Sequence, residues 1–301
     1  MSEKPRILLV TLSNIGDAVL TTPVLEALAG RWPERRIDLV ADRRSAEIFT
    51  RAPWLGQIHY RDKRAGWRGL VRLIHSLRRR RYELAVDLRT EWLTLTLRAR
   101  RRLMRPWGRR APGHSVVQHF AVVAGPLGLG SPPDPRVWLD EALREEALRR
   151  LGPFAGRRVL ALGPGANWSG KCWPPEYYAR LPGSLEAEFD GVLLLGGPDD
   201  RARCRMVAAA SPLPVLDLSG QTGLLQACAL LEQAAVFVGN DSGLGHMAAA
   251  VGTPVVTLFG PGEPGRYHPW GSHCRHLVAP GRELARLPVE QVAAVVGEVA
   301  R

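Results

Sequence analysis

The sequence predicts an α/β protein of two Rossmann-like domains, and three observations support this prediction. Short apolar segments bounded by turns alternate with segments of helical periodicity along the 301 residues. The apolar segments are nearly continuous, as is typical of parallel strands covered by helices on both faces. A proline- and glycine-bearing stretch over residues 151–156 separates two such series. We therefore expect an N-terminal domain over residues 1–152 and a C-terminal domain over residues 153–301, facing each other across a cleft.

The first half begins with a largely apolar run over residues 6–12, which predicts a buried strand. A Ser-Asn-Ile-Gly-Asp turn follows, and the periodicity after it predicts a helix over 18–29. Aliphatic clusters predict further strands over 37–41, 57–60 and 83–88, the last preceded by an arginine-rich helix from about residue 67. A helix over 115–127 ends at residues 128–135, whose glycines and prolines a helix does not cross.

The second half repeats the alternation. Strands are predicted over residues 158–162, 191–195, 215–217, 235–238 and 254–259, with helices over 176–181, 200–210, 224–233 and 243–251 between them. A last helix over 289–300 packs on either the C-terminal or the N-terminal domain. In such sheets ligands bind at the carboxyl ends of the strands, where the strand order reverses. We therefore expect the chemistry in the turns that follow the strands.

The excess of positive charge lies in the first half of the chain. Residues 1–150 hold 29 Lys/Arg and 16 Asp/Glu, a net charge of +13, whereas residues 151–301 hold 12 and 13, a net charge of −1. Arginine forks match the geometry of phosphate and carboxylate, so the first half is expected to meet an anionic partner. Alternatively, the arginines decorate solvated helix faces. A nucleic acid is disfavoured, because no zinc-finger spacing, aromatic RNA-binding strand or basic zipper accompanies the charge.

The composition and the apolar runs also indicate the cellular compartment of the protein. Four cysteines, at least 24 residues apart and without a CxxC pair, predict reduced thiols. No apolar run reaches the roughly 18 residues of a spanning helix. The apolar run over residues 7–10 is too short for the core of a signal peptide. We expect a cytoplasmic protein.

The turn after the first strand places a carboxylate, Asp17, at the start of a helix. It lacks the GxGxxG pattern, which disfavours dinucleotide binding of the usual kind. Asp17 is suited to act as a general base at the carboxyl end of the sheet. Alternatively, it only stabilises the start of the helix.

The turn over residues 165–172 fits the P-loop pattern GxxxxGK but lacks two features that a P-loop needs. Cys172 stands where Ser or Thr would hold magnesium, and Pro174 with Pro175 prevents a helix that begins at the lysine. What remains is a glycine-bearing loop that brings Lys171 to a strand end, where it can neutralise a diphosphate. The alternative is an ordinary surface lysine.

The turn at Asn240-Asp241-Ser242-Gly243 runs from a strand into a helix of small residues. The free N–H groups of such a helix start attract anions. Asp241 would repel phosphate, so it is better suited to accept hydrogen bonds from sugar hydroxyls. A plain helix cap is the alternative here, and His246 is alternatively a core histidine.

Four segments carry a resemblance to a known family: residues 13–23, 165–174, 195–200, and 240–250 together with Phe259-Gly-Pro261. In this order they resemble family 9 glycosyltransferases, the heptosyltransferases of lipopolysaccharide core assembly. The resemblance implies the two-domain GT-B fold, transfer with inversion, and neither a catalytic metal nor a cofactor. It also implies ADP-heptose as donor and an anionic lipid A–Kdo acceptor. We further expect a monomer in peripheral contact with the cytoplasmic face of the inner membrane, without a nucleic-acid partner.

Carried over by position, Asp17 would deprotonate the acceptor hydroxyl and Lys171 would stabilise the departing diphosphate. The donor residues implied are Asn167, Asp200, Thr222, Asp241, Ser242, Gly243 and His246. The acceptor residues expected are Ser13, Asn14, Arg64, Arg109 and Arg110. Two positions depart from the family pattern, Cys172 in place of a basic or bulky polar residue and Gly245 in place of a larger one. The alternatives are another donor or acceptor for the same chemistry, and a non-catalytic nucleotide-binding relative.

Overall fold

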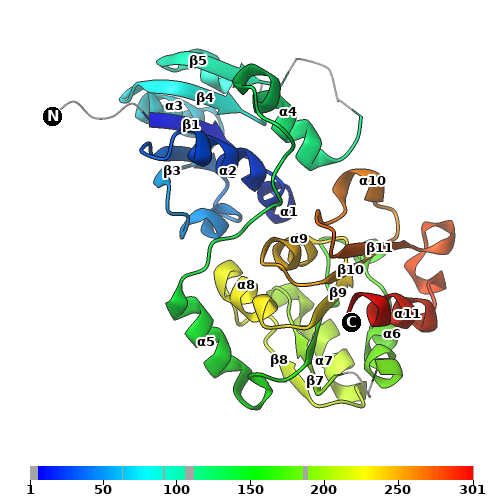
Figure 1. The fold of residues 1–301 in the computed structure, drawn as a ribbon. Coiled ribbons are helices and arrows are strands. Elements are labelled where there is room, and N and C mark those ends of the chain that lie inside the picture. The colour runs from blue at the N-terminus through cyan, green and yellow to red at the C-terminus, as the bar shows by residue number, and fades with distance from the viewer. Residues whose placement is uncertain (1–5, 63, 91, 106–111, 186–188, 301) are drawn as a thin grey trace. The chain divides into compact units, whose positions relative to one another are not determined.

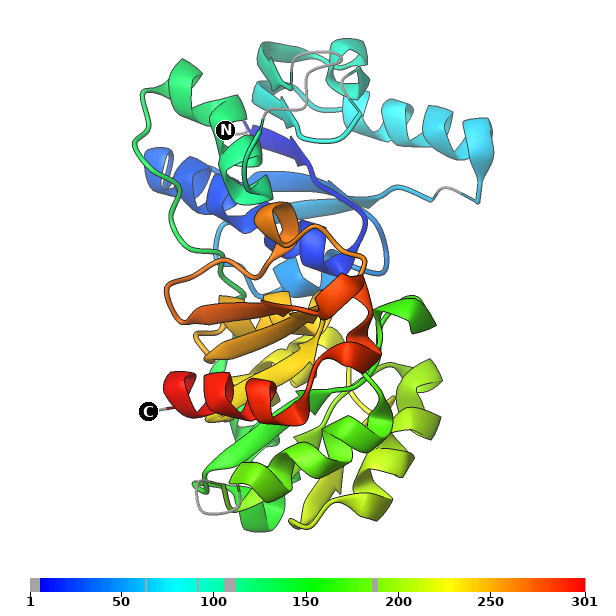
Figure 2. The same ribbon diagram turned by 90° about the vertical axis from the view of Figure 1, so that its right-hand side faces the viewer.

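The chain divides into two compact units, Met1–Trp138 (unit 1) and Leu139–Arg301 (unit 2). The computed structural model describes residues 6–62, 64–90, 92–105, 112–185 and 189–300. Each unit is a parallel sheet accompanied by helices (Figures 1 and 2). The predicted α/β class with two Rossmann-like units is confirmed. Among the described residues, no helix combines the length and apolar character that crossing a bilayer requires.

Unit 1 contains a five-stranded parallel sheet in the order β3-β2-β1-β4-β5. Its strands are β1 (Arg6–Val10), β2 (Ile37–Ala41), β3 (Leu55–Tyr60), β4 (Tyr82–Asp87) and β5 (Ala99–Met104). Its helices are α1 (Ile15–Val19), α2 (Thr22–Arg31), α3 (Gly66–Arg78) and α4 (Ser115–Leu127). The strand order reverses between β1 and β4, so a ligand-binding edge is expected at their carboxyl ends.

The edge strand β5 is not among the predicted strands, because three consecutive arginines occupy it. Charged residues are typical of edge strands, where they discourage pairing with another sheet. Local hydrophobicity alone therefore misses this strand.

The helix predicted over residues 18–29 is two helices, α1 and α2. Pro23 has no N–H to donate back to the carbonyl of Val19. The Thr22 hydroxyl instead donates to that carbonyl at 2.8 Å, and the Thr21 hydroxyl donates to the carbonyl of Ala18 at 2.7 Å. The break keeps α1 short and places Asp17 in its first turn.

Unit 2 contains a six-stranded parallel sheet in the order β11-β10-β9-β6-β7-β8. Its strands are β6 (Val159–Gly163), β7 (Gly191–Leu194), β8 (Val215–Asp217), β9 (Val236–Asn240), β10 (Val255–Phe259) and β11 (Cys274–Val278). Its helices are α5 (Glu141–Leu151), α6 (Pro175–Arg180), α7 (Arg201–Ala210), α8 (Leu224–Glu232), α9 (Gly243–Ala250), α10 (Pro264–Tyr267) and α11 (Val289–Val299). The order reverses between β6 and β9, which is the switch point of this sheet.

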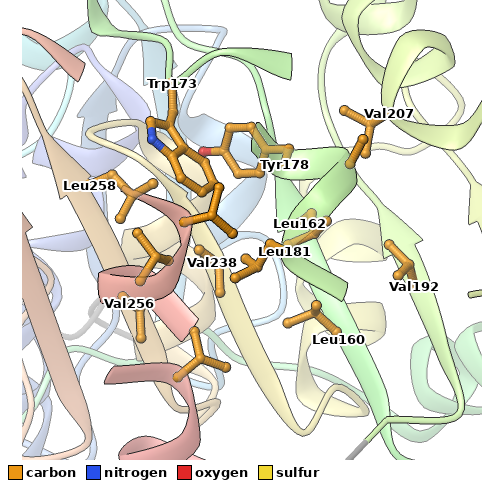
Figure 3. Close-up of a cluster of buried hydrophobic side chains, with 14 of the residues drawn as sticks. Leu160, Leu162, Trp173, Tyr178, Leu181, Val192, Val207, Val238, Val256 and Leu258 are labelled. Atoms are coloured by element: carbon orange, nitrogen blue, oxygen red, sulfur yellow. The ribbon is translucent and has the colours of Figure 1, made fainter. Parts of the chain in front are cut away.

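Helices cover both faces of the unit 2 sheet, with α8 and α9 on one face and α6, α7 and α11 on the other (Figure 1). The second face holds a large apolar cluster in which Trp173 and Tyr178 lie over aliphatic side chains of the strands (Figure 3). Val292 and Val296 of α11 belong to the same cluster. The last helix therefore packs on its own unit, which decides between the two placements that the sequence allows.

The division between the units lies earlier than the expected boundary between residues 152 and 153. Helix α5 belongs to unit 2 because its polar face is tied to α8. Arg144 donates two hydrogen bonds to the carboxylate of Glu232, at 2.8 and 3.1 Å, and the Gln226 amide donates to Glu146 at 2.8 Å. These charge-assisted contacts join residues about 80–90 apart in sequence, so local periodicity does not reveal them.

Candidate active site and family

Two of the expected turns meet at the switch point of unit 2. Strand β6 ends at Gly163, which pairs with Gly239 near the end of β9. Because both strands are parallel neighbours, the loop that leads to Lys171 and the turn at Asp241 leave the same edge of the sheet. The sequence places these turns on separate strands, and the sheet order brings them together.

Asn240 ties the two turns to each other. Its fully buried amide donates to the carbonyls of Pro164 at 2.9 Å and Gly165 at 3.2 Å. Its carbonyl oxygen accepts from the backbone N–H of Trp173 at 2.9 Å and from the Tyr178 hydroxyl at 3.0 Å. An amide offers two donors and two acceptor lone pairs, so this set uses its whole capacity. Asn240 therefore positions the β6 loop on β9.

From the sequence we predict no separate role for Asn240, because asparagine at the end of a strand is typical of a turn. The signal that could have drawn attention to it is its position as the last residue of a buried strand. A polar side chain there needs internal partners.

Lys171 and Asp241 form an ion pair, with 2.5 Å between Nζ and Oδ2. The two side chains are 32% and 12% exposed, respectively. An ammonium has three donors, so Lys171 retains two for a ligand while it holds Asp241. A Cβ added to Gly262 would lie 2.6 Å from Asp241 Oδ2, so the carboxylate occupies space that only glycine leaves open. The pair presents a fixed cation and a fixed acceptor side by side.

Helix α9 starts directly after this carboxylate. Ser242 is its N-cap residue in an extended conformation, yet its side chain makes no capping hydrogen bond. The Ser242 Oγ is buried and has no hydrogen-bond partner among the described residues. The helix start at Gly243 thus combines backbone N–H groups with an unused hydroxyl, a combination suited to an anion.

Two further residues of α9 lie beneath its start. His246 is only 6% exposed, which favours the core-histidine alternative over direct contact with a ligand. Gly245 is packed closely: an added Cβ would lie 3.3 Å from Pro269 and 3.4 Å from the hydroxyl of Thr257. A larger residue at this position requires a shift of its neighbours, so the departure at Gly245 matches its local packing.

Asp200 follows β7 and lies against the β6 loop. Its Oδ2 accepts from the backbone N–H of Gly197 at 2.8 Å, and its carboxylate occupies the space into which a side chain at Gly165 would point. Asn167 is exposed in the same β6 loop, and Thr222 is half-buried before α8. Thr222 follows β8, which β7 separates from β6, so it lies further from the switch point.

Cys172, beside the lysine, is half-buried, and burial raises the pKa of its thiol. The thiol lies 3.7 Å from the carbonyl of Trp168. A neutral thiol is a poor partner for a phosphate, unlike the basic or polar residue that the resemblance would place at this position.

In unit 1, Asp17 lies in the first turn of α1, after the central strand β1. Its carboxylate accepts a hydrogen bond from the amide of Asn14 at 3.0 Å, and Asn14 is exposed. Ser13 is buried, at 9% exposure. The loop after β1 thus brings a carboxylate to the switch point of the first sheet, where ligands bind in sheets of this kind.

Arginines gather at the same edge of the unit 1 sheet. A cavity of about 490 Å³ is lined by residues that directly follow β2 and β3, namely Asp42, Arg43, Arg44, Arg61, Asp62 and Arg64. Arg44 donates to both oxygens of Asp42 at 3.1 and 3.3 Å, and this hydrogen bonding lowers the pKa of the Asp42 carboxyl. Burial, and then the charge of Arg61, lowers the pKa of Arg89, which follows β4. Positive charge exceeds negative charge here, so the cavity suits an anion.

Of the expected acceptor arginines, Arg64 lies in this cavity, whereas Arg109 and Arg110 fall outside the described residues. Sequence reasoning missed Arg43, Arg61 and Arg89. The signal that could have found them is that each comes one or two residues after a strand, where parallel strands deliver their following residues to one edge.

No group of three or more His, Cys, Asp or Glu side chains among the described residues is arranged to hold a metal ion.

The sequence profile described as "Glycosyltransferase family 9 (heptosyltransferase)" matches residues 70–291, most of the chain. The chain belongs to glycosyltransferase family 9. This family 9 glycosyltransferase is 29% identical over 283 residues to lipopolysaccharide heptosyltransferase 3 of Escherichia coli K12, covering 85% of this chain and 82% of the relative. The resemblance found in the four turns is therefore confirmed, and the protein is a glycosyltransferase.

Solved structures support the fold of this family 9 glycosyltransferase. The family 9 glycosyltransferase of Veillonella parvula superposes with a TM-score of 0.88 at 20% identity, covering 100% of this chain and 98% of the other. E. coli heptosyltransferase WaaC, solved with ADP-2-deoxy-2-fluoro heptose, superposes with a TM-score of 0.78 at 22% identity, covering 97% and 99%. These likenesses confirm the GT-B fold.

Proposed function

We propose that this glycosyltransferase transfers a heptose from ADP-heptose to an anionic acceptor of the lipopolysaccharide inner core, with inversion and without a catalytic metal. The observation that carries the proposal is the Lys171–Asp241 pair next to the unused Ser242 hydroxyl at the start of α9. The relative named above as a lipopolysaccharide heptosyltransferase, and the sugar nucleotide in the WaaC structure, support the choice of substrates.

In the proposed donor complex, the diphosphate lies at the start of α9. The remaining Nζ donors of Lys171, the Ser242 hydroxyl and the N–H groups from Gly243 onward point to its oxygens. Asp241, held by Lys171, accepts from hydroxyls of the heptose. Asn167, Asp200 and Thr222 are assigned to the loops that hold the β-phosphate side and the nucleoside, and His246 to the support of α9.

The proposed reaction is a single displacement. The acceptor hydroxyl attacks the anomeric carbon while Asp17 takes its proton, and the bond between that carbon and the diphosphate oxygen breaks with its electron pair on ADP. Lys171 and the helix start stabilise this developing charge, which is the role that a metal plays in other transferases. One base without a second nucleophilic carboxylate suits inversion, since a retaining route through a covalent intermediate needs both.

The acceptor is proposed to bind in the arginine cavity, with Arg61 and Arg64 meeting its phosphate or carboxylate groups and Ser13 and Asn14 flanking Asp17. Arg109 and Arg110 remain proposed acceptor residues. This assignment gives the charge of the first half a purpose, because an inner-core acceptor is anionic and the guanidinium fork matches its groups. We place the reaction in the cytoplasm, at the inner face of the membrane, and propose that the protein works as a monomer.

The donor assignment is tested with Lys171→Met, which removes the ammonium but keeps most of the length of the unbranched side chain. ADP affinity measured by calorimetry is expected to fall about 10- to 150-fold, because hydrogen bonds to charged groups contribute roughly 1.5–3 kcal/mol. The double variant Lys171→Met/Asp241→Asn controls for leaving Asp241 unpaired. Arg205→Gln, on the exposed side of α7, is expected to bind ADP as the wild type does.

Two results would count against the proposal. If neither ADP nor any nucleotide sugar raises the melting temperature of the purified protein, the transferase assignment of this site fails, and a non-catalytic relative is favoured. If another nucleotide sugar stabilises it and ADP-heptose does not, the donor is different while the chemistry stands.

A further inference from the structure

We propose that the exposed face of helix α3 is the surface by which this protein docks on an anionic lipid bilayer. Trp67 and Val71 are 71% and 54% exposed, although both are large and apolar. They lie four residues apart and so share one face of the helix. The opposite face is accounted for, because Leu73 and Leu77 belong to the unit 1 core. The two apolar side chains of the exposed face therefore lie outside the core that the described residues of unit 1 form.

The charge around these two side chains is of one sign. Residues 64–82 contain no Asp or Glu. Arginines flank the apolar pair on the exposed side of α3 and just after it, namely Arg68, Arg72, Arg78 and Arg79. The Arg68 guanidinium lies 5.6 Å from the centre of the Trp67 ring. In Figure 2, α3 (cyan) has a long side that no other described element of unit 1 covers.

This combination fits a lipid surface. Basic residues near an anionic bilayer are attracted to its headgroups, while tryptophan prefers the boundary between headgroups and acyl chains. A helix with arginines beside a narrow apolar strip lies in the plane of the interface. Two apolar side chains are too few to bind without charge, so we expect the docking to require anionic lipid.

Two cavities beside the exposed face of α3 indicate why docking would help the reaction. This part of the inference rests on the proposed function. Trp67, Leu70 and Leu73 line a cavity of about 360 Å³ together with Arg61 and Asp62. The same two residues, Arg61 and Asp62, also line the arginine cavity. The proposed bilayer surface and the proposed acceptor cavity are thus contiguous within unit 1. An acceptor carried on a lipid would reach the arginines without leaving the membrane.

The test is co-sedimentation with vesicles of phosphatidylcholine alone and of equal parts phosphatidylcholine and phosphatidylglycerol. The wild type is expected to bind only the anionic vesicles. Arg68→Gln/Arg72→Gln is expected to lower the partition coefficient about 25-fold, since each arginine near the surface contributes about 1 kcal/mol, or about fivefold. Trp67→Ser/Val71→Ser is expected to lower it about tenfold, because apolar burial at the interface is partial.

The matched control is Arg205→Gln/Met206→Ser, which removes the same kinds of group from the exposed side of α7 in unit 2. It is expected to bind vesicles as the wild type does. The inference is overturned if the α3 variants bind anionic vesicles as well as the wild type, or if the control loses binding equally. It is also overturned if α3 instead binds generic duplex DNA and not vesicles.

Transfer to a water-soluble core oligosaccharide separates this inference from the proposed function. The α3 variants are expected to transfer to that acceptor at the wild-type rate while they lose vesicle binding. If the wild type binds vesicles through α3 but transfers to no core acceptor, the proposed function fails and the docking surface stands. If the wild type transfers to the core acceptor but does not bind vesicles, the docking surface fails and the proposed function stands.

Discussion

Replacing Asn240 by alanine should destabilise unit 2 much more than replacing an asparagine in an exposed turn would. The change removes two hydrogen bonds donated to the β6 loop and two accepted from Trp173 and Tyr178. The Trp173 N–H and the Tyr178 hydroxyl, which lose this acceptor, belong to fully buried residues, and the hydroxyl keeps only a long contact of 3.5 Å to the carbonyl of Gly163. Leaving a buried polar group without a partner costs about 1–3 kcal/mol each, so the free energy of unfolding should fall by roughly 4 kcal/mol.

The assay is urea unfolding followed by circular dichroism, together with the melting temperature. For a unit of this size, a loss of about 4 kcal/mol lowers the melting temperature by roughly 8–16 °C. Asn167→Ala is the matched control, because Asn167 is exposed in the same β6 loop and should change stability by less than about 0.5 kcal/mol. A loss below about 1 kcal/mol for Asn240→Ala, or one equal to that of the control, would show that Asn240 does not hold the two turns together.

Three further predictions concern the proposed chemistry and the pH dependence of stability. Asp17→Asn should lower kcat about 10²- to 10⁴-fold and leave ADP affinity unchanged, and a wild-type rate would remove Asp17 as the base. Gly262→Ala should displace the Asp241 carboxylate, whose Oδ2 would lie 2.6 Å from the new Cβ, and so raise the KM for the donor more than Gly265→Ala, where nothing lies within 4 Å. Equal KM values for the two variants would contradict this placement. His59 is buried, and burial lowers its pKa in the folded state. As the pH falls, the unfolded chain therefore binds a proton at His59 before the folded protein does. The free energy of unfolding should decline below about pH 6.5, and it should decline less steeply in His59→Gln. Identical pH profiles of the two proteins, measured by urea unfolding, would refute this contribution.

Several features of the fold follow from local sequence alone. The continuous apolar runs predict the central strands of both sheets, since a strand covered on both faces needs apolar residues at every position. The turn at Asp241 predicts the start of α9, because the serine and glycine there suit a helix start. Two of the errors lie where local pattern and environment disagree. The arginine-rich β5 does not look like a strand, and Pro23 divides a helix that otherwise looks continuous.

Some residues of the candidate site could be predicted from the sequence, but the contacts between them could not. Lys171 and Asp241 appear as separate functions, a cation for phosphate and an acceptor for sugar, whereas the structure pairs them across 70 residues. The arginine cavity draws its residues from the ends of β2 and β3, with Arg89 after β4 beside it. No single segment shows this cluster, because β2 and β3 are each followed by only two of its arginines, and β4 by one.

The sequence by itself determined the alternation of strands and helices, the family, and the turns that carry Asp17, Lys171 and Asp241. These depend on interactions within short segments, such as helical periodicity, proline geometry and helix-start preferences. Only the tertiary structure decided that α5 joins unit 2, that Asn240 binds the β6 loop, and that Lys171 meets Asp241. Those contacts depend on which strands become neighbours, and strand order is set by packing of the whole sheet.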